Sequence, residues 1–326
     1  MNSYLKTDTP TIYADMNVFR YVACGDISIS EPERFHWVYS QVHLDEIHRN
    51  GNTDALEGIR ILGAIEIVDT LNYEFQSVGD IRLKKYIDPY VRYEQYLDAI
   101  TGYEGISDHT MEYLIRAFGA DNFSSLCQAP DQMRESINRL TTELDDFTRN
   151  DLLKRADSVS NEMSKMIHVH LKDKIPIDKT RKAMGFTSEI RKILETSQSP
   201  IDEIYNLIAP SLNGVSINQF FGFEKAPWLE GIPHTQHGAI SSAQIILNML
   251  GISPDQGLAK RDKIMNILSD GQHMGMASYC NAVLSADSRF CNKARAIYTY
   301  LGSITNTVHF ELKKGMELKL TIVNTK

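Results

Sequence analysis

The stretch from Ser269 to Phe290, SDGQHMGMASYCNAVLSADSRF, decides the fold class of this chain. Asp270 stands before a run of small residues and predicts a helix N-terminus, where Ser or Asp commonly caps. The apolar run Ala282–Leu284 predicts a buried strand, which ends at Ser285 and is followed by Asp287. Ligands of open α/β sheets bind outside the carboxyl ends of the strands, so the two acids predict a site at that edge.

The N-terminal segment contributes two further acids of the same kind. Thr11–Ala14 predicts a short strand that ends at Asp15, followed by a turn through Asn17 into a helix. Asp is a poor strand residue, so Asp15 is either a helix N-cap or a site residue. Trp37–Ser40 predicts a second strand, and Glu46 on the helix after it can point along the sheet edge.

Further strands are predicted at Ile65–Val68 and Asn306–Phe310, with Glu317–Val323 as an additional edge strand that could serve a homodimer. His43 and His48 stand five positions apart, which suits a shared helix face poorly, so we expect surface histidines rather than a metal pair.

The middle of the chain has a different character. Apolar residues recur at threes and fours from Asp131 to about His170, which is typical of helix, and strand alternation is not evident from residue 72 to residue 228. We therefore predict a discontinuous α/β domain, residues 1–71 and 236–326, with an all-α module inserted at residues 72–235. The segment around Pro227–Gly238 would lead back to the α/β domain.

A basic run lies within the predicted module. Seven basic residues and three acids occur between Lys172 and Lys192 in a protein of net charge −8. The run is either a solvated surface or a patch that binds phosphate groups. The residues of the second interpretation are Lys172, Lys174, Lys179, Arg181 and Lys182.

The overall composition narrows the class of protein. The chain has 326 residues, 42% of them hydrophobic, and a pI near 5.7, so it has no global positive field that would attract nucleic acid. Its four cysteines are scattered without C-x-x-C spacing, and no signal peptide or membrane-length apolar run is present. These features predict a cytoplasmic protein that does not enter the membrane.

The chemistry of the predicted site follows from its charge. Four acids at one sheet edge repel one another unless a cation lies between them, and hard carboxylate oxygens suit Mg²⁺ or Mn²⁺. Such ions support phosphodiester hydrolysis. The chain has neither a G-x-x-x-x-G-K-[ST] loop nor a G-x-G-x-x-G motif after a strand, which disfavours a nucleotide-cofactor enzyme.

These segments resemble the PIN-like nuclease domains in order and spacing. The matching pieces are the strand and turn IYADMN at residues 12–17, the segment SQVHLDEI at residues 40–47, and the run from Asp270 to Asp287. The resemblance covers about residues 9–70 and 240–312, and the long insertion departs from compact family members.

The resemblance implies a PIN-like α/β fold and a metal-dependent endoribonuclease. The acids Asp15, Glu46, Asp270 and Asp287 would bind the metal, Asn17 and Ser285 would orient a carboxylate, phosphate or water, and His273 would either face the substrate or lie on the helix surface. Such nucleases are often bacterial toxins or defence effectors, and the insertion would select RNA or bind a protein partner. Two alternatives stay open, namely a flap-type or single-strand DNA nuclease and a non-catalytic binding module.

Overall fold

The computed structural model describes residues 5, 7–71, 77–101, 112, 115–116, 118–142, 144–173, 177–224, 234–255 and 260–322. The chain divides into two compact units. The first comprises Met1–Glu94, Met184–Pro254 and Ile267–Lys326, and the second comprises Gln95–Ala183 and Asp255–Asn266.

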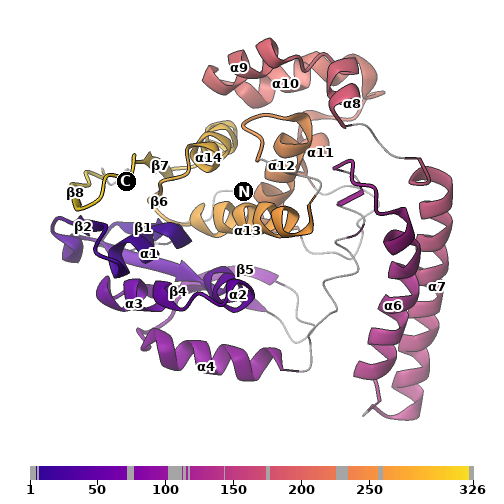
Figure 1. Cartoon of the computed structure of the whole chain (residues 1–326), viewed down its shortest axis with the longest axis horizontal. Helices are drawn as coiled ribbons and strands as arrows, with labels where there is room; N and C mark the ends of the chain where they lie inside the picture. Colours follow the sequence, from indigo (N-terminus) through magenta and orange to yellow (C-terminus); the bar gives the residue numbers. More distant parts are fainter. Residues whose placement is uncertain are drawn as a thin grey trace. The chain divides into compact units, whose positions relative to one another are not determined.

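The first unit is built on a six-stranded, mostly parallel sheet flanked by helices, which confirms the predicted α/β class (Figure 1). The strand order is β5–β4–β3–β1–β6–β7, and only β5 runs antiparallel to its neighbour. The strands are β1 (Thr11–Ala14), β3 (His36–Ser40), β4 (Ile65–Leu71), β5 (Ser77–Leu83), β6 (Ala282–Ser285) and β7 (Asn306–His309).

The predicted strands lie where the sequence places them, with differences at the edges. The sequence does not predict β5, because its residues mix charged and apolar side chains without a clear alternation. The C-terminal segment forms β8 (Met316–Leu318), which pairs with β2 (Ile27–Ile29) in a separate two-stranded sheet. The expected extra edge strand of the main sheet is therefore wrong.

The helices of the first unit pack on this sheet and on one another. They are α1 (Met16–Ala23), α2 (Gln41–Asn50), α3 (Asp54–Ile61), α9 (Ser188–Thr196), α10 (Pro200–Ile208), α11 (Ile217–Phe221), α12 (Gln236–Leu250) and α14 (Ser288–Leu301), with 3₁₀ turns at Pro32–Arg34 and Ala209–Ser211. α4 (Pro89–Ile100) and α13 (Arg261–Ala277) contribute residues to both units.

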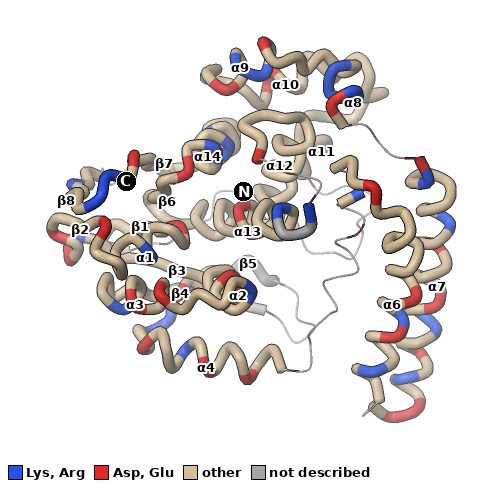
Figure 2. The backbone as a smooth tube through the Cα atoms, viewed as in Figure 1, with Lys and Arg blue, Asp and Glu red and all other residues tan. Residues whose placement is uncertain are grey.

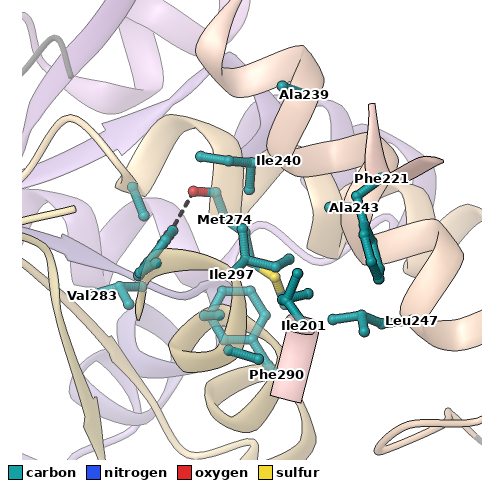
Figure 3. Packing of buried hydrophobic residues seen from close by; sticks show 14 of the residues in the cluster. Ile201, Phe221, Ala239, Ile240, Ala243, Leu247, Met274, Val283, Phe290 and Ile297 are labelled. Carbon is teal, nitrogen blue, oxygen red and sulfur yellow. Dashed lines mark hydrogen bonds between the residues drawn. The ribbon is translucent and has the colours of Figure 1, made fainter. Parts of the chain in front are cut away.

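One hydrophobic core joins the sheet to helices that are far apart in sequence. The register aligns Tyr13 with Val38 and Val283, so these side chains share one sheet face. That face is buried with residues of α10, α12, α13 and α14, which Figure 3 shows around Met274, Ile297 and their neighbours. The core explains why residues 184–235, which we predicted to belong to the inserted module, lie in the same unit as the sheet.

The second unit contains a hairpin of two long helices. The single periodic segment predicted from Asp131 to His170 is two helices, α6 (Phe123–Leu140) and α7 (Asp146–His170). The break falls where Asp145 caps α7, because its carboxylate accepts hydrogen bonds from the N–H groups of Phe147 and Thr148. α8 (Ile177–Ala183) also belongs to this unit.

Among the described residues, no helix combines the length and the apolar character that crossing a membrane requires.

Candidate active site at the carboxyl end of β1

The sheet topology selects one place for a ligand. From β1 the chain proceeds to β3 and β4 on one side, whereas β6 and β7 lie on the other side of β1. The strand order therefore reverses between β1 and β6, and the crevice at such a switch point is where open α/β sheets bind ligands. Asp15 follows β1 and Asp287 follows β6, so two of the predicted acids flank this point.

Asp15 is buried at the switch point of the sheet. It stands at the N-cap position of α1, as the N-cap interpretation predicts, but its side chain makes no capping hydrogen bond. Its Oδ2 instead accepts a hydrogen bond of 2.8 Å from the hydroxyl of Ser285 on the neighbouring strand. Burial raises the pKa of Asp15, and Glu46 raises it further, whereas His273 and Ser285 lower it.

Ser285 connects the two acids. Its hydroxyl donates to Asp15 and accepts the backbone N–H of Asp287 at 3.0 Å, so its position depends on both residues. Asp287 caps α14, since its Oδ1 accepts the N–H groups of Arg289 at 2.7 Å and Phe290 at 3.2 Å. Asp287 therefore has a structural role that Asp15 lacks, and about a third of its side chain is exposed.

Glu46 lies on α2, and contacts with α13 fix its position. Its Oε2 is 3.5 Å from His273 Nε2, and its Oε1 is 3.3 Å from the guanidinium of Arg49. Arg49 also donates a 3.1 Å hydrogen bond to the hydroxyl of Ser269. Burial raises the pKa of Glu46, but His273 and Arg49 outweigh it and lower the value to about 2. Glu46 is thus a carboxylate at neutral pH.

His273 faces the interior rather than the solvent. It is 1% exposed, and its Nδ1 lies 2.7 Å from the hydroxyl of Tyr13. Within the described part of the chain, its Nε2 is buried and has no hydrogen-bond partner, because Glu46 lies at ion-pair distance only. The expectation that His273 lies on the helix surface is therefore wrong.

A second buried histidine lies beside this pair, and the expectation that His43 is a surface residue is also wrong. Its Nδ1 accepts the backbone N–H of Ser40 at 3.1 Å, so its Nε2 carries the proton and donates to the Ala14 carbonyl at 2.9 Å. Burial and the neighbouring His273 lower the pKa of His43 to about 3. His43 therefore holds the end of β1 against the start of α2 as a neutral group.

Tyr13 links the two histidines beneath the acids. Its hydroxyl is 2.7 Å from Ser40 Oγ and 3.4 Å from His43 Nδ1, in addition to its contact with His273. Tyr13, Ser40, His43 and His273 therefore form a buried polar network, which we call the sub-site network, directly behind Asp15 and Glu46. The sequence gives no local sign of this network, because its members come from β1, β3, α2 and α13.

Asp270 does not begin a helix, contrary to the expectation from sequence. α13 starts at Arg261 and runs without a break to Ala277, so Asp270 is an interior helical residue and is half-buried. A glycine in this helix has a packing role. A Cβ on Gly275 would lie 2.6 Å from the carbonyl oxygen of His237, so the glycine allows α12 to approach closely.

The four predicted acids are only partly assembled. Asp15 interacts electrostatically with Glu46, and Ser285 joins Asp15 to Asp287, whereas Asp270 is one helical turn from His273. Across the residues that the structure describes, no three His, Cys, Asp or Glu side chains are grouped closely enough to hold one ion between them. Asn17 is half-buried in the first turn of α1.

The basic run does not form one surface. Arg181 is buried and pairs with Asp178 at 3.1 Å, so it does not serve as an exposed phosphate contact. Lys172, Lys179 and Lys182 are exposed, and Lys174 lies outside the described residues. Figure 2 shows that α8 carries acidic as well as basic positions, which weakens any local positive field.

Comparisons of the chain with protein-family models, with curated proteins and with solved structures return no match.

Proposed function

We propose that this protein is a metal-dependent phosphodiester hydrolase that cleaves RNA, with Mg²⁺ or Mn²⁺ as its ion. The observation that carries the proposal is Asp15, a buried carboxylate at the switch point of the sheet that makes no capping hydrogen bond to α1 and interacts electrostatically with Glu46. Holding an ionised carboxylate in this position opposes folding, and a bound cation would offset that cost.

The residues present fit a hydrated ion better than an ion enclosed by protein. Mg²⁺ usually keeps several waters and is held through one or two carboxylates, so a site need not bring three ligands together before the ion binds. Asp15 and Glu46 would hold the ion. Asp287, which Ser285 connects to Asp15, and Asp270, one helical turn from His273, would act through water. A bound divalent ion supplies the charge that lowers the pKa of a water and neutralises a developing oxyanion.

The chain's own residues prepare the two carboxylates. Ser285 orients Asp15 through the hydrogen bond to Oδ2, and His273 and Arg49 keep Glu46 ionised. The preference for RNA over DNA rests on the resemblance to PIN-like nucleases. Binding of a protein partner by the second unit rests on the same resemblance.

Cleavage assays test this proposal directly. Labelled single-stranded RNA, structured RNA and DNA would be incubated with the protein in Mn²⁺ or in EDTA. Asp15→Asn and Glu46→Gln should lower the rate at least about 100-fold, within the range for loss of one electrostatic contact to the reacting group. Asp8→Asn is the matched control, since Asp8 is exposed before β1 at the opposite edge of the sheet.

The outcomes separate the alternatives. Cleavage that survives EDTA or both site substitutions contradicts the metal-nuclease proposal. Cleavage of DNA alone indicates the DNA nuclease. If no nucleic acid is cleaved and Mn²⁺ does not bind the wild-type protein by calorimetry, the acids serve only the fold.

A further inference from the structure

A groove of about 680 Å³ lies in the first unit, on the side of α14. Its walls come from the end of α9, the start of α10, the turn after α12 and one face of α14. The residues used below are Leu194, Glu195, Ile252, Ser253, Asn292 and Arg295. This volume is within the range of small-molecule sites in proteins.

The groove follows the helix that Asp287 caps. Asn292, Arg295 and Thr299 recur at threes and fours, so they share one face of α14, and that face extends back to Ser288 beside Asp287. Asn292 is five residues beyond Asp287, which corresponds to about 7.5 Å along the helix axis. The groove therefore begins one to two helical turns from the candidate active site.

Electrostatic contacts show the same proximity. Cys291 precedes the groove residue Asn292 in α14, and burial raises the pKa of its thiol to about 12. Asp15 and Asp287 raise this pKa further, whereas Arg295 lowers it. The charge of Arg295 therefore acts on the same thiol as the charges of Asp15 and Asp287.

The polar groups of the groove are held in place by one another. The backbone N–H of Ser253 donates to Glu195 Oε1 at 2.6 Å, and Ser253 adopts a left-handed conformation with φ of 43°. A buried non-glycine residue in that region is strained, so the surrounding contacts must hold it. Asn292 in turn accepts a hydrogen bond of 2.9 Å from the guanidinium of Arg295.

Arg295 brings a guanidinium group to the groove. Its hydrogen-bond partner Asn292 is neutral, and within the described ranges Arg295 forms no ion pair with a carboxylate. Glu195 lines the same groove, but its carboxylate is engaged by the backbone of Ser253. Figure 2 shows the basic positions on α14, with an acidic position at its start.

We propose that this groove binds one nucleotide of the RNA strand next to the bond that is cleaved. Arg295 contacts the phosphate, because a guanidinium matches phosphate geometry with two donors. The buried side chains of Leu194 and Ile252 supply an apolar wall for the base, and the amides and hydroxyls contact its edge. The proposal rests on the proposed nuclease function for its place in the reaction.

Binding is tested without turnover. The full-length Asp15→Asn protein in EDTA would be titrated by calorimetry with each of the four nucleoside 5′-monophosphates, with the matching nucleosides and with inorganic phosphate. At least one monophosphate should bind at least about tenfold more tightly than its nucleoside and than phosphate, since both parts of the ligand contribute. Adding Arg295→Gln should weaken that binding at least about tenfold, which corresponds to the loss of about one charge-assisted contact.

Two further variants make the result specific to the groove. Arg34→Gln is the matched control, because Arg34 is an exposed arginine that pairs with Glu31 and precedes β3 at the opposite edge of the sheet. Thr299→Trp, on the exposed rim, should fill the groove and abolish binding. Binding that is absent, equal for nucleoside and monophosphate, equal for phosphate and monophosphate, or unchanged in Arg295→Gln overturns the inference.

The cleavage and binding assays together distinguish a wrong groove assignment from a wrong proposed function. If the protein cleaves RNA but binds no nucleotide in this assay, only the groove assignment is wrong. If it binds a nucleotide through Arg295 but cleaves nothing, the groove is a nucleotide site and the nuclease proposal is wrong.

Discussion

Replacing Asp15 by Asn should make the protein more stable and inactive at the same time. The substitution keeps the shape of the side chain and the hydrogen bond from Ser285, but it removes a buried negative charge and its repulsion from Glu46. Each unit by which the folded protein raises the pKa of Asp15 costs about 1.4 kcal/mol of stability at neutral pH. The new amide NH₂ group brings two N–H donors, and each donor left without a partner costs about 1 kcal/mol or more.

We therefore expect a net gain in the free energy of unfolding, and each 1 kcal/mol of gain would raise Tm by about 2 °C for a chain of this size. Thermal unfolding in EDTA measures it. Addition of Mn²⁺ at 100 times its dissociation constant should then stabilise the wild-type protein by about 2.7 kcal/mol and leave Asp15→Asn unchanged. The order of the two melting temperatures therefore reverses when the metal is added.

The pH dependence gives an independent check on the cause. An acid with a raised folded pKa binds its proton more tightly in the folded state, so its stability cost appears only as the pH rises above the unfolded value of 3.8. The advantage of Asp15→Asn over wild type should thus be greatest at neutral pH and shrink as the pH falls toward 4. A control is Asp287→Asn, since Asn caps a helix as well as Asp and should leave Tm in EDTA unchanged.

Two results would refute this reasoning. If Asp15→Asn is less stable than wild type in EDTA, the carboxylate is part of the structural framework. If Mn²⁺ raises both melting temperatures equally, the ion binds elsewhere.

Three further predictions concern the residues around the site. Glu46→Gln should lower the free energy of unfolding by about 1–3 kcal/mol at pH 7, because the lowered pKa of Glu46 stabilises the fold above the unfolded value of 4.5. Chemical denaturation measures this difference from wild type, which should disappear as the pH falls toward 2. Tyr13→Phe should lower the free energy of unfolding by about 1–3 kcal/mol, because Ser40 and His273 lose a buried hydrogen-bond partner. The same variant should lower the cleavage rate more than the metal affinity, since the tyrosine hydroxyl positions His273. Gly58→Ala should abolish folding, because the added Cβ would lie 1.9 Å from the carbonyl oxygen of Phe19. Circular dichroism measures this, and a variant that folds normally would contradict the close approach of α3 to α1.

The acids at strand ends could be predicted because local sequence places them. A short apolar run followed by a polar residue marks the end of a buried strand, and β1, β3 and β6 end as predicted at Ala14, Ser40 and Ser285. The helices between these strands favour parallel pairing, and the carboxyl ends of parallel strands lie at the same edge of the sheet.

The network behind the acids could not be predicted, because its members meet only in the folded chain. Tyr13 and His273 are 260 positions apart, and the sequence pattern around His43 gives no sign that the ring is buried. The continuity of α13 was missed for a related reason. Asp270 has the residue type of a helix cap, but it lies inside a helix whose Gly275 is required by the close approach of α12.

The structure gives Asp287 a role in the fold and gives Asp15 none. Asp287 is accounted for by the cap of α14, and it would be retained in a protein without a metal site. Asp15 has no such explanation, because its side chain makes no capping hydrogen bond, is buried and is repelled by the charge of Glu46. A chain selected only for stability would place an uncharged residue there, so Asp15 is the position at which the case for function is strongest.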